Sequence, residues 1–423
     1  MRWAVLAVGV VACYAPAAPE GAPCTTSVEC PGDQVCTGGR CSTDPGTDGG
    51  VDAGTDSPPG GAFTPSNGVD ATAVQMVSAP IVIGGDATFN TETGRITGGF
   101  KRAAGEGVIA GIGFQRVGAL GVFVFESVVV AGAIHFDGAS PVAFLVHGEI
   151  VIDGEIDGSG GCNGSRLCAG PGGGTGARFG AVAGGCGPGG AGESDTVTAN
   201  SDAGGGGGGG GEPGAAGGDA GTFVGGAGGI ACLAPTLEPL VGGSGGGGGG
   251  KGELAGAGGG GGGGALQITA LGSITVRGAI AMNGAGGEGG PGGAVSDGPG
   301  GAGGGAGGAI LLEAPSVILT DTAIVVANGG GGGGAANSAT PGSPGESGRR
   351  DATPALGGAG ASAPVGNGGN GGAGLVPSAP AGSTADNQNS GGGGGGVGRI
   401  FVRGDAIVGG TISPAAGTGP LKP

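Results

Sequence analysis

Aromatic residues are scarce in this chain. They make up 3% of its 423 residues, with a single tryptophan and a single tyrosine. Basic residues are few as well, because 15 lysines and arginines face 32 aspartates and glutamates, which gives a formal net charge of −17. Such a balance excludes nucleic acid as a partner and disfavours an anionic membrane surface, since both require basic patches. The sequence also lacks the ~20 consecutive apolar residues of a membrane-spanning helix.

Glycine, in contrast, is abundant and accounts for 124 residues. The glycines follow no Gly-X-Y register, which excludes a collagen triple helix. Glycine loses more backbone entropy on folding than any other residue, so a chain this rich in it folds only where regular interactions offset that loss. The apolar residues are therefore the place to look for a repeat.

A strand repeat begins in residues 121–158. Apolar residues occur there in pairs two apart, as in strands, and the pairs recur about every six residues. They are Val122/Val124, Val128/Val130, Ile134/Phe136, Phe144/Val146, Ile150/Ile152 and Ile156. Three pairs per eighteen-odd residues suit one triangular coil of a parallel β-helix, and a single coil cannot bury its apolar side alone.

Further copies follow at long intervals. They comprise Leu266/Ile268, Ile274/Val276 and Ile280/Met282; Ile310/Leu312, Val317/Leu319 and Ile324/Val326; and Ile400/Val402, Ala406/Val408 and Ile412. A degenerate first coil precedes them, with Ile81/Ile83, Ala87/Phe89 and, on its third side, Ile112/Phe114. The sequence thus predicts an all-β domain over residues 63–423, a solenoid resembling a parallel β-helix.

Three glycine-rich insertions, 158–264, 284–308 and 329–397, interrupt this solenoid. Each insertion leaves after the third strand pair of one coil and returns before the first strand pair of the next coil. If the coils stack, all three insertions therefore emerge along one edge of the solenoid. They form either a disordered fringe or a layer of polyglycine II helices, which have three residues per turn and ~3.1 Å rise. We expect their tips, around Glu212–Pro213 and Arg349–Asp351, to carry any binding.

The nine cysteines indicate export. Residues 1–13 end in Val-Val-Ala-Cys and resemble a bacterial lipoprotein signal peptide with its lipobox, which makes Cys13 the lipidated residue. The alternative is an ordinary export signal cleaved a few residues later. Residues 42–62, rich in Asp, Gly, Thr and Pro, predict a disordered acidic linker.

The remaining eight cysteines form two groups of four. Cys24, Cys30, Cys36 and Cys41 predict a small two-disulfide motif over 24–41, with open connectivity, because no CxxC pair or histidine supports zinc. Cys162, Cys168, Cys186 and Cys232 lie in the first insertion, where two further disulfides or, less suited to their spacing, a metal site are the choices.

An acidic row supplies the one enzymatic hypothesis. Asp153, Glu155 and Asp157 alternate with Ile152 and Ile156 and so share an outer face. Polysaccharide lyases and hydrolases built on a β-helix keep paired carboxylates on such a face. The basic and aromatic residues that hold a sugar are missing here, which favours a solvated acidic face. We predict no catalytic residue, no cofactor and no metal.

Taken together, the lipobox, the cysteine motif, the acidic linker and the alternation of strands with glycine tracts resemble glycine-rich (PGRS-like) bacterial cell-surface lipoproteins. The resemblance is compositional. It implies a non-catalytic structural or adhesive protein at the outer membrane or cell surface, held by its lipid anchor, with a surface glycan or protein as partner. A degenerate carbohydrate-active β-helix enzyme is the alternative.

Overall fold

The computed structural model describes residues 35–37, 40–42 and 63–423, except 163, 180, 196–200, 254, 294–297 and 386–387. The chain divides into two compact units, Met1–Pro58 and Pro59–Pro423. In the first unit, β1 (Val35–Thr37) and β2 (Arg40–Ser42) pair antiparallel. Cys13, Cys24 and Cys30, the side chains of Cys36 and Cys41, and residues 43–62 lie outside the described part. The lipid anchor, the first cysteine motif and the linker therefore stay predictions.

The second unit is built of strands, which confirms the all-β class. Its helical segments among the described residues are two short 3-10 turns, η2 (Ser66–Gly68) and η3 (Ala71–Met76). The strands form two curled mixed sheets, one of seven and one of twelve strands. Their bounds are β3 (Ile81–Ile83), β4 (Ala87–Asn90), β5 (Ile96–Gly98), β6 (Gly107–Ile109), β7 (Ile112–Val117), β8 (Leu120–Phe125), β9 (Val128–Val130), β10 (Ala133–Asp137), β11 (Val142–Val146), β12 (Ile150–Ile152), β13 (Glu155–Asp157), β14 (Ala265–Ala270), β15 (Ser273–Val276), β16 (Ala279–Ala281), β17 (Ala309–Leu319), β18 (Ile324–Val326), β19 (Arg399–Val408), β20 (Thr411–Ser413) and β21 (Gly417–Gly419).

Strands from successive passes of the chain lie side by side in parallel. One row contains β8, β11, β14, β17 and β19. A second contains β3, β9, β12, β15 and the later halves of β17 and β19. A third contains β4, β10, β13, β16, β18 and β20. The predicted repeat therefore pairs copy with copy, although long insertions separate the copies in sequence.

The main core lies inside these rows, and most predicted inward residues are found in it. Phe144 and Val146, for example, are fully or almost fully buried there. Three strands differ from the prediction. On the later half of β19, the predicted inward residues Ala406 and Val408 are exposed. Two other strands have the opposite face inward. On β8 the core residues are Phe123 and Phe125, not Val122 and Val124, and on β18 the core residue is Val325 rather than its neighbours.

The reason for the error on β8 is a second apolar cluster on its outer side. Val122 and Val124 pack there with Leu145, beneath η3 and a loop that carries Leu237. Both faces of β8 are thus buried, and an apolar run buried on both faces has no period to read. The placement of Ile112 and Phe114 on a third side is also wrong, because β7 pairs antiparallel with β8 as a hairpin.

A buried polar network ties the same outer face together. The Glu313 carboxylate is fully buried and accepts hydrogen bonds from Ser66 Oγ (2.5 Å) and Thr269 Oγ1 (2.9 Å). Arg403 lies 3.3 Å from Glu313 and 2.7 Å from Glu238. A buried carboxylate needs such partners, because an unpaired charge there is costly.

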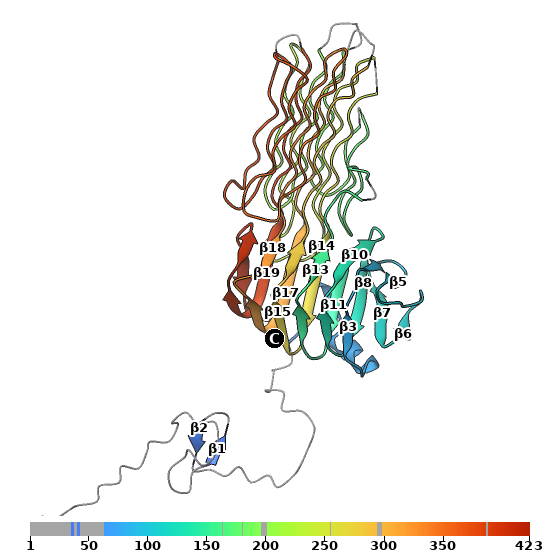
Figure 1. The fold of residues 1–423 in the computed structure, drawn as a ribbon, viewed down its shortest axis with the longest axis vertical. Helices are drawn as coiled ribbons and strands as arrows, with labels where there is room; N and C mark the ends of the chain where they lie inside the picture. Colours follow the sequence, from blue (N-terminus) through green and yellow to red (C-terminus); the bar gives the residue numbers. More distant parts are fainter. Residues whose placement is uncertain are drawn as a thin grey trace, which may run out of the picture. The chain divides into compact units, whose positions relative to one another are not determined.

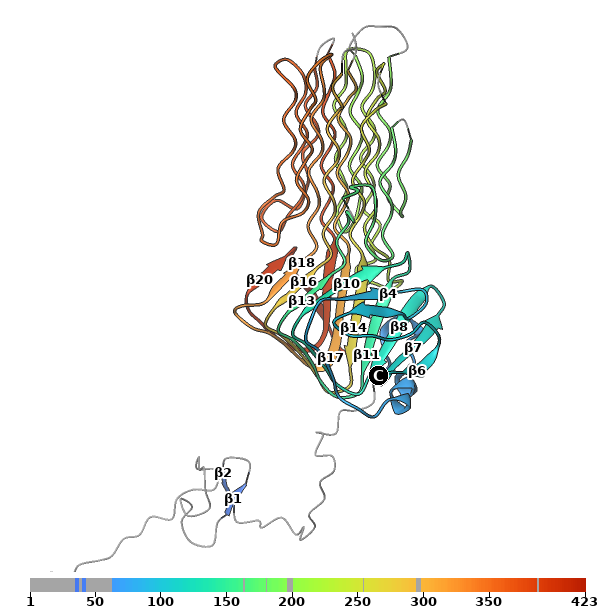
Figure 2. The ribbon, with the colours of Figure 1, turned by 45° about the vertical axis from the view of Figure 1, so that its right-hand side comes forward.

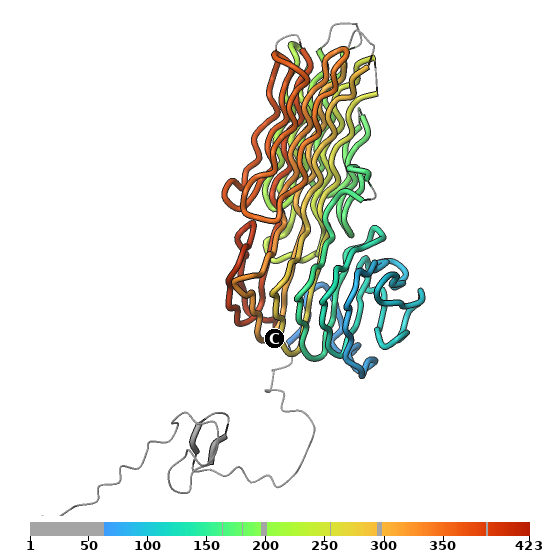
Figure 3. The backbone as a smooth tube through the Cα atoms, in the orientation of Figure 1, coloured from blue at the N-terminus to red at the C-terminus, as the bar shows by residue number. Residues whose placement is uncertain are grey.

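The three insertions form one bundle of extended segments on one side of the strands (Figure 1, Figure 2, Figure 3). Segment 298–308 lies inside it and hydrogen-bonds to six other segments. Its N–H groups donate in rotation to segments 390–396, 282–288 and 244–247, with N···O distances of 2.7–3.2 Å. Its carbonyls accept from segments 205–208, 260–263 and 330–333. The direction of donation repeats every three residues, and ordered packing replaces the disordered fringe among the described residues.

Glycine is required by this packing. A Cβ added to Gly303 would lie 1.9 Å from the carbonyl oxygen of Gly206 in a neighbouring segment. Outer segments carry side chains at every third position instead, as with Val224, Ala227 and Ile230, all of them exposed. The low complexity of the insertions therefore has a steric cause.

Two disulfides hold the first insertion, in agreement with the expectation of disulfides there. Cys162 pairs with Cys168, and Cys186 pairs with Cys232. The second pair joins segments that run side by side, and both of its sulfurs lie 3.9 Å from Ser244 Oγ on a third segment. All four cysteines of this insertion are in disulfide pairs.

Candidate functional site

The glycine bundle ends away from the strands in a set of turns, which we name the distal end. It comprises the described residues 193–195, 201–202, 219–223, 251–253, 337–341, 362–365 and 388–390. Segment 298–308 runs directly into β17, so its start at Gly298 lies roughly 30 Å from that strand at ~3.1 Å per residue. The distal end is the part of the bundle where side chains replace glycine.

A buried amide and a hydroxyl side chain crosslink the segments there. The Asp202 N–H donates to Asn389 Oδ1 at 2.8 Å, and Asn389 Nδ2 donates to the carbonyls of Ala336 (3.0 Å) and Gly298. Ser390 Oγ donates to the carbonyl of Asp219 at 2.6 Å. Asn389 is 1% exposed. One asparagine thus links three segments, which fixes the distal turns relative to one another.

Further side-chain hydrogen bonds hold the turns, both within one turn and between neighbouring segments. Glu193 accepts from the Val224 N–H at 2.8 Å, and Asn337 Oδ1 accepts from the Thr340 N–H at 2.8 Å. Asn337 Nδ2 also donates to Ser362 Oγ at 3.0 Å, which joins two turns. Asparagine and acidic side chains that accept nearby N–H groups are typical of rigid turns.

Other side chains of the distal end point to solvent. The exposed set is Thr222, Lys251, Glu253, Thr340, Pro341, Ser362 and Pro364. It is polar, of mixed charge, and contributed by turns that lie far apart in sequence. Loops held by a rigid scaffold are where binding residues concentrate.

The predicted tips are elsewhere. The N–H groups of Gly211 and Glu212 bond to the carbonyl of Val397, immediately before β19, which places Glu212–Pro213 at the strand end of the bundle. Arg350 lies at the same end and forms ion pairs with Glu155 and Asp157 on β13. The first and third insertions make several passes, so they also turn back at the strand end, whereas insertion 284–308 goes out and returns once.

The three carboxylates of the acidic row pair with two arginines. Asp153 pairs with Arg277 at 3.0 Å, and Arg350 binds both Glu155 and Asp157, the latter at 3.1 Å. Burial alone would lower the pKa of Arg350, but the hydrogen bond and charge of Glu155, with those of Asp157, raise it overall. The carboxylates of the enzymatic hypothesis are therefore engaged by cations.

A groove of about 770 Å³ lies beside this row. His135, Phe136 and Asp137 of β10 line it together with Asp157, and the disulfide Cys162–Cys168 borders it. Asp137 accepts a hydrogen bond from Asn90 Nδ2 at 3.2 Å. The groove is polar, with one aromatic ring at its wall.

Within the described residues there is no helix able to cross a membrane and no group of three His, Cys, Asp or Glu placed to hold a metal ion. Comparison with known proteins adds no assignment. No protein-family model matches the chain, and no similar curated protein or solved structure was found.

Proposed function

We propose that this chain is a non-catalytic protein of the bacterial cell envelope that presents the distal end of a polyglycine II bundle to a surface glycan or protein. The observation that carries the proposal is the hydrogen bonding of segment 298–308 to six neighbours, which makes the bundle rigid. A rigid bundle holds the distal turns in a fixed arrangement, which reduces the ordering cost of binding.

The scaffold beneath is best understood as a parallel β-helix. Support comes from the three rows of parallel strands and from the shared inward residues. The rows supply neighbouring strands ~4.8 Å apart, and each insertion rises from the end of one strand and returns to the next. The β-helix thereby sets where each glycine segment starts.

Membrane attachment completes the proposal. A lipid on Cys13 and the acidic linker would hold the domain at the outer membrane. Palmitate labelling should map to Cys13, and Cys13→Ala should release unlabelled protein. Release of unlabelled wild-type protein would refute the anchor.

The binding test uses beads coated with the full chain, offered to a glycan array and to whole cells. We expect Thr222→Ala, Lys251→Ala and Thr340→Ala combined to abolish capture, because these side chains are exposed at the distal end. A matched control replaces Asp153 by Asn and Glu155 by Gln and should capture normally. Capture that survives the distal variant, or that the control abolishes, contradicts the proposal.

The alternative, a carbohydrate-active enzyme, is supported by the groove beside His135, Asp137 and Asp157. A reducing-end assay over a polysaccharide panel tests it. Cleavage that is lost in Asp137→Asn would establish the enzyme and replace the adhesive function.

A further inference from the structure

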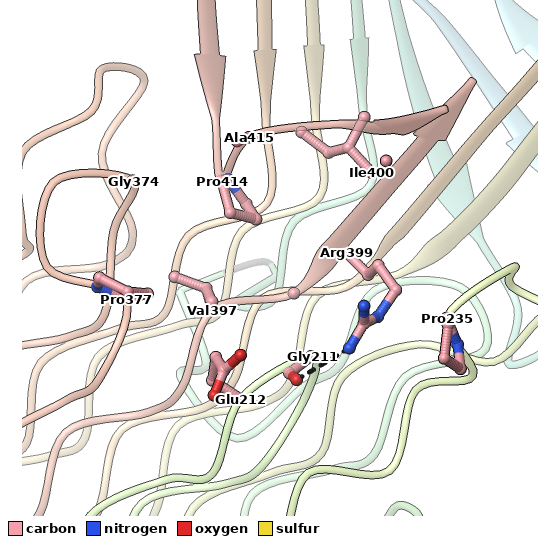
Figure 4. A pocket seen from close by; sticks show the side chains of 12 residues that line it. Gly211, Glu212, Pro235, Gly374, Pro377, Val397, Arg399, Ile400, Pro414 and Ala415 are labelled. Carbon is pink, nitrogen blue, oxygen red and sulfur yellow. Dashed lines mark hydrogen bonds between the residues drawn. The ribbon is translucent and has the colours of Figure 1, made fainter. Parts of the chain in front are cut away.

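A small cavity of about 230 Å³ lies where β19 meets the strand end of the bundle (Figure 4). Its walls come from parts of the chain far apart in sequence. Val397 and Ile400 are buried, and Pro235, Pro377 and Pro414 also line it. Rigid prolines and buried aliphatic side chains make a preformed cavity whose walls are partly apolar and partly polar. It is smaller than the ~300–1,000 Å³ typical of sites for drug-sized ligands.

Two side chains of opposite charge line this cavity, and they are not paired with each other. Figure 4 shows the Arg399 guanidinium on one side and the Glu212 carboxylate on the other. Arg399 Nη2 donates to the carbonyl of Gly211 at 3.0 Å. Neither residue takes part in the ion pairs found among the described residues.

Arg399 also has an unused donor. Its Nε is buried and has no hydrogen-bond partner in the structure. A buried donor on a charged group costs free energy when it is left unpaired, so such groups normally meet an acceptor. The guanidinium edge is a fork that suits a carboxylate. Arg399 lines the cavity and has no ion-pair partner among the described residues, so its charge, rather than the enclosed Nε, indicates an anionic group on a ligand.

The carboxylate of Glu212 restricts which anion fits. A phosphate dianion would be repelled by Glu212 in the same small cavity, and a plain carboxylic acid would leave Glu212 without a counter-charge. A plain amine would leave Arg399 without a counter-charge. A molecule that carries both a carboxylate and an ammonium group satisfies both, with Glu212 at the solvent-exposed side of the cavity.

We propose that this cavity binds a small α-amino acid, with its carboxylate at Arg399, its ammonium group at Glu212 and a small aliphatic or proline side chain against the walls. The site lies at the strand end of the bundle, opposite the turns assigned to adhesion. Its test is therefore independent of the proposed function. Occupation would bring together the first insertion, the third insertion and β19, each of which supplies wall residues.

The test is calorimetric titration of the full chain with alanine, proline and valine. The matched half-molecules propionate and ethylamine, and inorganic phosphate, are titrated in parallel. We expect at least one of the amino acids to bind, and propionate, ethylamine and phosphate to bind at least about tenfold more weakly than it does. Absence of binding by all three amino acids at ~10 mM, or tighter binding of phosphate, overturns the proposal.

Variants assign the two charged residues. Arg399→Gln and Glu212→Gln should each weaken binding of the amino acid at least about tenfold, whereas Arg277→Gln, which removes an exposed ion pair elsewhere, should not. Arg399→Lys should recover only part of the affinity, because it keeps the charge but lacks the fork. If Arg399→Gln does not fold, the affinities of Glu212→Gln and Arg399→Lys for the amino acid test the proposal instead. Unchanged affinity in Glu212→Gln contradicts the zwitterion.

Discussion

A single methyl group inside the glycine bundle should destabilise the whole domain. Gly303→Ala places a Cβ 1.9 Å from the carbonyl oxygen of Gly206 and 2.4 Å from its carbon, whereas ordinary contact begins at 3.4 Å. The two segments must therefore separate by about 1.5 Å, the difference between 1.9 and 3.4 Å. The Gly206 carbonyl also accepts from the Gly247 N–H at 2.8 Å, a bond that such a shift breaks.

The expected cost follows from two effects. Overpacking a dense interior costs about 1–3 kcal/mol, and leaving buried N–H and carbonyl groups unpaired costs about 1–3 kcal/mol. Gly303→Ala should thus lower the free energy of unfolding by about 2–6 kcal/mol, a large share of the ~5–15 kcal/mol typical of a domain. Scanning calorimetry measures the loss, and hydrogen exchange of residues 298–308 should accelerate.

The control is Gly84→Ala. No atom lies within 4 Å of a Cβ at Gly84, and its backbone is not left-handed. A free-energy change within about 0.5 kcal/mol is expected there. If Gly303→Ala were as mild as Gly84→Ala, the segments would not be packed as described, and the steric account of the glycine content would be refuted.

Three further perturbations test other parts of the domain. Ile152→Asp puts a charge at a fully buried position and should abolish the cooperative calorimetric transition, whereas Thr275→Ala on an outer position should shift it little; similar effects would contradict the register. Cys186→Ser opens a link between residues 46 apart and should cost about 4 kcal/mol. A reducing agent should destabilise the wild type by at least as much, because it also opens Cys162–Cys168, and a wild type unchanged by reduction would count against this account. Burial alone would raise the pKa of Glu238, but hydrogen bonding and charge pairing with Lys422, and then the charge of Arg403, lower it overall. The ionised Glu238 therefore stabilises the folded domain above the unfolded pKa of about 4.3, and this contribution is lost as the pH falls through the lower folded pKa. The difference in Tm between wild type and Glu238→Gln should shrink in that acidic range, and a constant difference would exclude the linkage.

Apolar spacing was sufficient for strands with one buried face. Ile150/Ile152 and Ile274/Val276 are inward as predicted, because the residues between them are not buried and the period of two has a single interpretation. It failed on β8, where a loop from the first insertion covers the outer side. That loop is more than a hundred residues away in sequence, and nothing local to β8 signals its arrival.

The candidate site could not be predicted in the same way, because a glycine run does not show whether the chain is leaving the strands or returning to them. The number of passes in each insertion decides which turn is distal, and polar stretches occur at both kinds of turn. The sequence therefore predicts a tip at Glu212, which in the structure lies beside β19. The pairing of Arg350 with Asp157, 193 residues apart, was equally hidden. Asn389 gave a weak signal, as an amide between glycine runs.

The threefold rotation of donors along segment 298–308 restricts how the length of this bundle can change. One added residue would turn every later N–H in a segment by about 120° toward the wrong neighbour, whereas three added residues restore the direction after ~9.3 Å. Insertions and deletions within paired segments are thus tolerated in steps of three. The length of the bundle can therefore change in steps of three residues per segment. Each such step moves the terminal turns along the bundle axis and leaves their orientation unchanged.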